Sequence, residues 1–392
     1  MRAFVDVAWE SLSRHGEELC GDTVKVTTTQ NSFVAVLSDG LGSGVKANIL
    51  STLTAQIAGA MFARQARIED VVETLAETLP ECHERKLAYA TFAMLKILHG
   101  TEALLVEYDS PPLILVRDGE VVTLPVREQV INGRRIREAR FHLRVGDYLV
   151  MVSDGYEHAG VGGLYRLGWG WQNIATSVKR WCATGGDAHS LVNALVRTCL
   201  KLYDGRPGDD ATCVAMHVRR AVRATVLTGP PADKEQDEFA VARLMAGEGI
   251  KVICGGTTAQ LAARVLDKPL QVEWVPPSQR TKSQPARKKG TPPMARLEGV
   301  DLVTEGIITL GQTLELLEAA ETVHDLPPGS DAATRLARIL LSSDDIHFVV
   351  GTAINPHQIA DVIRGETMRM MYVRDIVSHL KRRNKEVTVE RV

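Results

Sequence analysis

Four short motifs built around aspartate are the residues of this chain best suited to chemistry. They are Gly21-Asp22, Ser38-Asp39-Gly40, Ser153-Asp154-Gly155 and Gly208-Asp209-Asp210. Carboxylate oxygens are the ligands that hard divalent cations prefer, and a glycine carbonyl can approach an ion that a side chain would block. Separated carboxylates of this kind predict an oxygen site for two cations, which is suited to phosphate ester hydrolysis.

Three of these motifs adjoin a run of apolar residues that reads as a buried strand. These runs are Phe33 to Leu37, Tyr148 to Val152 and Cys213 to Met216. The glycines at 40, 42 and 44 follow the first run and precede an expected helix at 45–65. Taken alone, this segment could equally be an ordinary strand-to-helix turn. A dinucleotide loop is disfavoured because its glycines would be spaced G-x-G-x-x-G and because it would not explain Asp154 and Asp209.

The order GD–SDGLGSG–SDG–GDDAT resembles the metal-dependent type 2C Ser/Thr phosphatases, in particular the stage II sporulation protein E branch. The resemblance covers about residues 15–218. Further segments that resemble this branch are Tyr89-Ala90-Thr91-Phe92, Ser110-Pro111-Pro112, Arg117-Asp118-Gly119 and Gly146-Asp147-Tyr148.

The resemblance implies a site for two Mn²⁺ or Mg²⁺ ions. Asp39 matches the carboxylate that bridges both ions, Gly40 lends its carbonyl, and Asp22 matches a ligand of one ion. Asp154 and Asp209 match ligands of the other ion, with Asp39 and Asp154 as the catalytic pair. The family pattern favours Asp209 over Asp210, which would then be a supporting group. The implied substrate is phosphoserine or phosphothreonine on a signalling protein, such as an anti-sigma-factor antagonist.

One departure from the family concerns the proton for the leaving alcohol. Many type 2C enzymes carry a histidine after the Asp-Gly pair, whereas this chain has Leu41. His158 is a weak candidate for the acid, and a structural or surface role is the stronger expectation for it. A second departure is that no arginine near the N-terminus is an obvious clamp for the phosphate, and the sequence does not choose between Arg2 and Arg14. These departures motivate an alternative function, a regulatory binding module whose phosphatase fold turns over slowly or not at all.

Composition and length indicate a two-domain globular protein. The chain has 392 residues, 45% of them hydrophobic and 24% charged, and a net charge of −2. That charge gives no sign of a nucleic-acid surface, and no apolar run approaches the roughly 18 residues that span a bilayer. Asp6 and Glu10 interrupt the N-terminal segment where a signal peptide would be apolar, so we expect a cytoplasmic protein without a membrane partner. The six cysteines are scattered and predict neither a zinc site nor a disulfide framework.

We expect residues 1–220 to form the phosphatase-like domain. Short strands separated by tight turns between 90 and 153 indicate antiparallel sheets, and helices at 45–65, 68–79, 171–183 and 187–203 flank them. The predicted fold is an αββα sandwich of two antiparallel sheets.

Residues 221–392 are expected to form a smaller α/β domain, because strands and helices alternate there and indicate a mainly parallel sheet. A basic segment at 276–293 is predicted to be a mobile loop. The turn Gly255-Gly256-Thr257-Thr258 follows a strand and could bind a small anionic ligand, or could simply cap a helix. Thr304-Glu305-Gly306 is expected at the same sheet edge. The role of this domain is open between a ligand sensor and a docking domain for the phosphoprotein.

Overall fold

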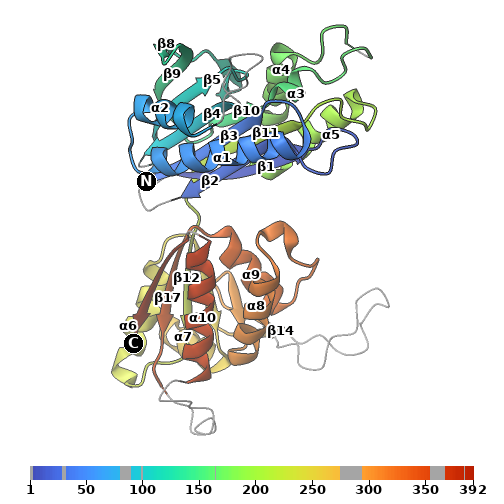
Figure 1. Cartoon of the computed structure of the whole chain (residues 1–392). Helices are drawn as coiled ribbons and strands as arrows, with labels where there is room; N and C mark the ends of the chain where they lie inside the picture. Colours follow the sequence, from blue (N-terminus) through green and yellow to red (C-terminus); the bar gives the residue numbers. More distant parts are fainter. Residues whose placement is uncertain are drawn as a thin grey trace. The chain divides into compact units, whose positions relative to one another are not determined.

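The computed structural model describes residues 3–28, 32–79, 90–98, 100–163, 165–273, 294–353, 367–383 and 385–392. The chain divides into two compact units, Met1–Arg220 and Ala221–Val392 (Figure 1). The basic segment 276–293 lies outside the described residues. In the described part of the chain, no helix is both long and apolar enough to cross a bilayer.

The first unit contains two sheets in which every strand pair is antiparallel. One sheet has the order β1-β11-β10-β6-β7 and the other the order β2-β3-β4-β5-β9-β8. Their strands are β1 (Ala3–Leu12), β2 (Asp22–Thr28), β3 (Ser32–Gly40), β4 (Ala90–Leu98), β5 (Glu102–Tyr108), β6 (Ile114–Arg117), β7 (Glu120–Val122), β8 (Val126–Ile131), β9 (Arg134–His142), β10 (Tyr148–Val152) and β11 (Ala211–Arg220).

The helices of this unit are α1 (Gly44–Ala63), α2 (Ile68–Thr78), α3 (Asp154–Glu157), α4 (Trp171–Cys182) and α5 (Ala188–Leu202). Helices α1 and α2 pack on one face of the six-stranded sheet, where Val34 and Val36 are buried. Helices α4 and α5 pack on the five-stranded sheet, over Val150 and Val152. The predicted αββα sandwich is therefore confirmed.

Between the two sheets lies a third apolar core. Its members include Ala35 and Leu37 from β3, Leu149 and Met151 from β10, and Met216 from β11. Successive side chains of a strand point to opposite faces, so a strand with a core on each side must be apolar throughout. This explains why β3 and β10 read as continuous apolar runs that end abruptly at an aspartate.

The second unit has a seven-stranded, mainly parallel sheet with the order β14-β15-β16-β13-β12-β17-β18, as expected for an α/β domain. Only β15 pairs antiparallel, with β14 and β16. The strands are β12 (Arg223–Thr228), β13 (Ile250–Cys254), β14 (Gln271–Glu273), β15 (Met294–Arg296), β16 (Leu302–Thr304), β17 (Asp345–Val350) and β18 (Glu386–Arg391). The helices are η1 (Lys234–Gln236), α6 (Asp237–Ala246), α7 (Gly256–Leu266), α8 (Ile307–Ala319), η3 (Val323–Asp325), α9 (Ala332–Ser342) and α10 (Met368–Arg382).

Both faces of this sheet are covered. Leu227 and Ile253 pack with α6 and α7, whereas Val226 and Phe348 pack with α8, α9 and α10. The alternating pattern of this domain predicts a long final helix at about 356–383. The structure has α10 beginning at Met368, and residues 354–366 lie outside the described part.

Candidate metal centre

Asp22 and Asp39 lie directly opposite each other on the antiparallel strands β2 and β3. Opposed residues of such a pair project from the same face with Cβ atoms about 5 Å apart. Asp22 is only 4% exposed. Its Oδ2 accepts a hydrogen bond from the Ser153 hydroxyl (2.7 Å), and its Oδ1 is buried without a hydrogen-bond partner among the described residues. A buried carboxylate oxygen of this kind is costly unless another group, such as a cation, satisfies it.

Ser153 joins the two sheets at the site. Its hydroxyl donates to Asp22 of the six-stranded sheet and accepts a hydrogen bond from the backbone N–H of Thr212 on β11 (2.8 Å). This places Asp154, the next residue, beside the carboxylates of β2 and β3. The serine of this Ser-Asp-Gly motif therefore has a positioning role.

The glycines that follow Asp39 and Asp154 are required by close backbone contacts. A Cβ at Gly40 would lie 2.1 Å from the carbonyl oxygen of Ala47, and a Cβ at Gly155 would lie 2.1 Å from that of Asp210. Any side chain at these positions would push α1 away from β3, or the Asp210 segment away from Asp154. The Gly40 N–H also donates to the Gly21 carbonyl (3.2 Å).

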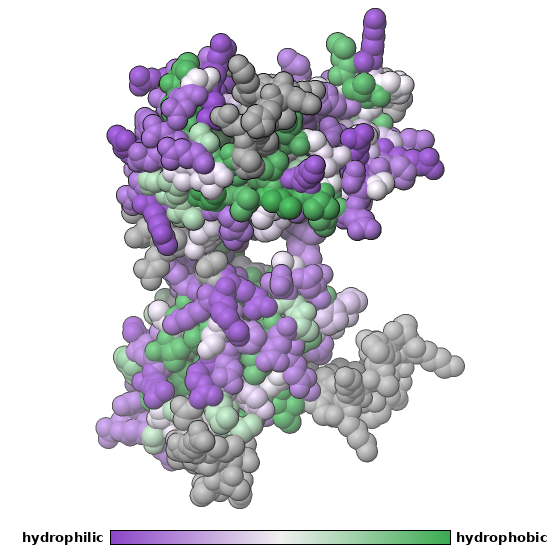
Figure 2. Space-filling model, in the orientation of Figure 1, coloured by the Kyte–Doolittle hydropathy of each residue, from purple (hydrophilic) through white to green (hydrophobic). Residues whose placement is uncertain are grey.

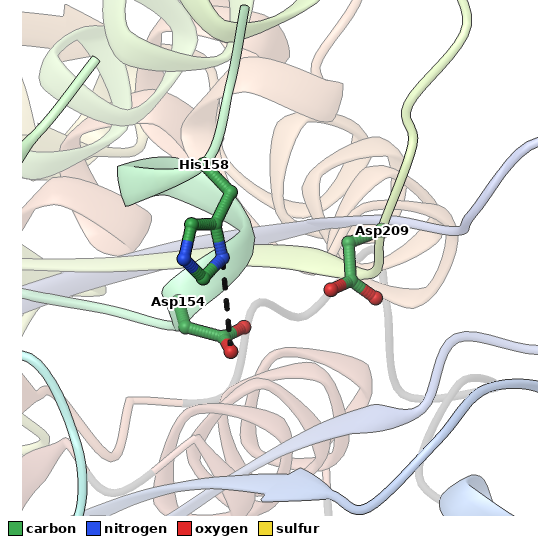
Figure 3. A group of neighbouring side chains, drawn as sticks. All are labelled: Asp154, His158 and Asp209. Carbon is green, nitrogen blue, oxygen red and sulfur yellow. Dashed lines mark ion pairs between the residues drawn. The ribbon is translucent and has the colours of Figure 1, made fainter. Parts of the chain in front are cut away.

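Asp154, His158 and Asp209 form one group (Figure 3). One ligand atom from each lies within 4.8 Å of those of the other two, and His158 Nδ1 is 3.9 Å from Asp154 Oδ2. Asp154 begins α3 and His158 directly follows it, whereas Asp209 precedes β11. From the sequence, His158 is expected only as a weak candidate for the proton donor. Its i, i+4 spacing from Asp154 is the signal that would have placed it in this group.

The electrostatics show that these carboxylates crowd together. Burial, together with Asp22, Asp154 and Asp209, raises the pKa of Asp39 to about 9. Burial raises the pKa of Asp22 to about 7, against the hydrogen bonds from Ser153 and Thr212 that favour its ionised form. Burial and Asp154 also raise the pKa of Asp209. Nearby like charges disfavour ionisation, so the site favours protons, or cations in their place.

Asp209 and Asp210 face different neighbours. Asp210 is 3% exposed, its Oδ1 accepts the Arg14 backbone N–H (3.0 Å), and its Oδ2 lies 2.7 Å from where a Cβ of Gly21 would be. Asp209 instead joins Asp154 and His158. The Asp210 carboxylate thus contacts the segment that precedes β2.

Arg14 is the arginine that the structure brings to the site. Its guanidinium donates to the Ser43 hydroxyl (3.3 Å), and its charge lowers the pKa of Asp209 against the larger effects of burial and Asp154. The sequence does not choose between Arg2 and Arg14 as the arginine that binds the phosphate. Arg2 lies outside the described residues. Leu41 is 42% exposed beside Asp39 and carries no proton to donate.

In the second unit, Gly255 and Gly306 are in contact. The Gly255 N–H donates to the Thr304 carbonyl (2.9 Å), and a Cβ at Gly306 would lie 3.4 Å from the Gly255 Cα. Gly255 caps α7, whose first residues are Gly256, Thr257 and Thr258. The Gly255-Gly256-Thr257-Thr258 turn and the Glu305-Gly306 segment therefore share the edge formed by the carboxyl ends of the parallel strands.

A family model decides the affiliation of the first unit. Residues 29–219 match the model described as stage II sporulation protein E (SpoIIE). The first unit is a SpoIIE-like domain with the type 2C phosphatase fold. No curated protein sequence matches the chain significantly.

Solved structures similar to the SpoIIE-like domain share little sequence with it. The phosphatase domain and part of the regulatory domain of SpoIIE from Bacillus subtilis are 19% identical with a TM-score of 0.47; the match covers 56% of this chain and 64% of that one. This chain therefore spans less than two thirds of that structure's length. The RsbU and RsbW domains of a Mycobacterium tuberculosis protein are 17% identical (TM-score 0.45; 62% and 67% covered). RsbX in complex with magnesium is 18% identical (TM-score 0.40; 55% and 95% covered).

Proposed function

We propose that the SpoIIE-like domain is a metal-dependent phosphatase acting on phosphoserine or phosphothreonine in a protein. The observation that carries the proposal is the crowding of Asp22, Asp39, Asp154 and Asp209, with Asp22 Oδ1 buried and without a partner in the described structure. A carboxylate-rich donor set with an unsatisfied buried oxygen fits two hard divalent cations, Mn²⁺ or Mg²⁺.

Each aspartate would have a distinct role in binding the two ions. Asp39 would be shared between the two ions, with the Gly40 carbonyl beside it, Asp22 would serve one ion, and Asp154 and Asp209 the other. When bound, such a pair of cations supplies charge neutralisation for the phosphoryl oxygens and a hydroxide near neutral pH. The chain's own task is to hold these carboxylates at fixed positions, which the contacts of Ser153, Gly40 and Gly155 support.

Arg14 would orient the phosphoryl group. Its guanidinium lies at the site beside Ser43 and Asp209, and planar N–H donors suit phosphate oxygens. Asp210 supports this role because it holds the Arg14 backbone. Since Leu41 cannot protonate the leaving alcohol, a water molecule would supply that proton. We expect Arg14→Met to raise KM more than it lowers kcat, with Arg67→Met, an exposed arginine at the start of α2, as the control.

A protein substrate is favoured by the surface next to the site. Four apolar side chains that are 42–60% exposed recur at intervals of four residues from the turn before α1 into its first half: Leu41, Val45, Ile49 and Leu53. Figure 2 shows an apolar area on the first unit where Figure 1 places α1. Contiguous exposed apolar side chains commonly mark surfaces that bind other proteins. The finer proposal is a signalling phosphoprotein, such as an anti-sigma-factor antagonist.

The first test is hydrolysis of para-nitrophenyl phosphate and of phosphoserine and phosphothreonine peptides with Mn²⁺ or Mg²⁺. Turnover that requires the ion supports the proposal. Absence of hydrolysis with both ions on all substrates overturns it. If the protein binds two ions but hydrolyses no phosphoprotein, the regulatory binding module takes its place.

For the second unit we propose a sensor of a small anionic ligand that regulates the phosphatase. Strand β12 is the first strand of the second unit and lies between β13 and β17 in its sheet. The later strands are therefore added on both sides of β12, and α/β sheets usually bind ligands at the strand ends where the strand order reverses in this way. At the ends of β12 and β17, the partly buried Arg369 donates to the Gly351 carbonyl (2.9 Å). Burial lowers the pKa of Arg369, and its described contacts include no carboxylate. An anion would compensate this buried charge.

Two measurements separate the sensor from a passive docking domain. A nucleotide or sugar phosphate should raise the Tm of the wild type, and Arg369→Met or Gly256→Val should reduce that shift. Truncation after Arg220 should also change turnover on para-nitrophenyl phosphate. If no ligand shifts the Tm and truncation alters only the affinity for the phosphoprotein, docking is the function of this unit.

A further inference from the structure

His158 offers the one nitrogen in the group that it forms with Asp154 and Asp209. Asp154 is the first residue of α3 and His158 follows its last residue. The His158 N–H donates to the Asp154 carbonyl (2.9 Å), so one helical turn holds both side chains on the same side. Figure 3 shows the imidazole directed toward the Asp154 carboxylate, with Asp209 beside them on a separate segment.

The spacing of these groups suits a common ion. Ligand atoms held at about 2.1 Å from one metal ion lie roughly 3 to 4 Å from one another. His158 Nδ1 is 3.9 Å from Asp154 Oδ2, and all three ligand atoms fit within 4.8 Å. The His158 and Asp154 side chains are half-exposed, so each has room to rotate toward a common ion.

A simple surface ion pair does not account for this arrangement. The His158 and Asp154 side chains are 56% and 47% exposed, and an exposed pair contributes little to stability. Asp209, from a distant part of the chain, nevertheless converges on the same point. In the same site, Asp22 is 4% exposed and its Oδ1 has no hydrogen-bond partner among the described residues. His158 therefore adds an exposed nitrogen to a site that also contains a buried carboxylate oxygen without a partner in the described structure.

We propose that His158 is a nitrogen ligand of the ion held by Asp154 and Asp209, and that it makes the site select Mn²⁺ over Mg²⁺. This inference rests on the metal site of the proposed function. Mg²⁺ is a hard cation that keeps oxygen ligands and waters, whereas imidazole binds first-row transition ions well. One nitrogen among oxygen donors therefore favours Mn²⁺ without excluding Mg²⁺.

Affinity measurements on the full chain test the selectivity. Isothermal titration with Mn²⁺ and with Mg²⁺ compares the wild type with His158→Gln, and His189→Gln, an exposed histidine on α5 outside the group, serves as the matched control. We expect His158→Gln to weaken Mn²⁺ binding about tenfold or more and Mg²⁺ binding by less than about threefold. The control should retain both affinities.

Chemical protection tests coordination directly and needs no turnover. Diethyl pyrocarbonate modifies accessible imidazole nitrogens, and mass spectrometry reports the modification of His158 and His189 separately. At equal saturation, Mn²⁺ should protect His158 much more than Mg²⁺ does, His189 should be unaffected, and Asp154→Asn should abolish the protection. Equal protection by both ions, or an unchanged affinity ratio in His158→Gln while the wild type binds metal and hydrolyses substrate, overturns the ligand role alone. If the wild type binds neither ion, this inference and the proposed function both fail.

Discussion

Replacing Asp39 by asparagine should stabilise the metal-free protein. Burial and the charges of Asp22, Asp154 and Asp209 raise the pKa of Asp39 from 3.8 to about 9. Below the unfolded pKa, both the folded and the unfolded chain carry the proton, and the group has no effect on stability. Above it, the unfolded chain releases the proton while the folded chain retains it, so wild-type stability falls as the pH rises toward the folded pKa.

The size of the effect follows from this pH window. At about pH 7, some three pH units above the unfolded pKa, the retained proton lowers the free energy of unfolding of the wild type by at most about 4 kcal/mol. Water entering the site and side-chain rearrangement reduce that limit, so we expect Asp39→Asn to gain about 1–3 kcal/mol near neutral pH. The gain should shrink toward zero near pH 4. Asparagine is neutral and of the same size, so packing changes little.

Urea denaturation in EDTA, followed by tryptophan fluorescence, measures this gain. Four of the five tryptophans lie in residues 1–220, so the signal reports mainly on the first unit. Glu77→Gln, an exposed acid-to-amide change on α2, is the control and should leave the free energy of unfolding unchanged. With saturating Mn²⁺, the wild type should be more stable than Asp39→Asn, because it binds the ions more tightly than the variant does. A variant no more stable than the wild type at about pH 8 in EDTA, or a gain independent of pH, would refute the reasoning.

Two further substitutions test how the site is held. Ser153→Ala removes a buried hydroxyl that bonds both Asp22 and the Thr212 N–H, and should lower the free energy of unfolding by about 1–3 kcal/mol in urea titrations. A loss as small as that of Ser177→Ala, at a partly exposed serine on α4, would count against this role. Gly155→Ala places a Cβ 2.1 Å from the Asp210 carbonyl oxygen and should lower both the Tm and metal affinity, and wild-type values for both would contradict the close contact.

The fold was largely predictable because both sheets of the first unit carry strong local signals. Strands such as β3 and β10 are apolar on both faces and end in turn residues. The second unit was read less completely. The sequence predicts only that strands and helices alternate there and does not place helix α9, although Asp331 caps it and Leu336 and Leu340 are spaced as on one helix face. Strand β18 alternates polar and apolar residues from Glu386 to Glu390 at the sheet edge, which is a weak signal on its own.

The motifs of the site could be predicted from the sequence, but their arrangement in space could not. Aspartates at strand ends can be read from the sequence, since each follows or precedes an apolar run. Their convergence depends on contacts between distant segments, such as the Ser153–Asp22 hydrogen bond across 131 positions. For the same reason the sequence could not choose between Arg2 and Arg14, or place Asp209 and Asp210 against their different neighbours.

Phosphate release from a phosphothreonine peptide tests the central claim most directly. The wild-type chain and Asp154→Asn are compared side by side at saturating Mn²⁺, with folding of both checked by tryptophan fluorescence. Our account predicts turnover by the wild type that EDTA abolishes, and a loss of about a hundredfold or more in the variant, since removal of one ligand disrupts the ion beside the phosphoryl group. A folded Asp154→Asn that releases phosphate at the wild-type rate would contradict it.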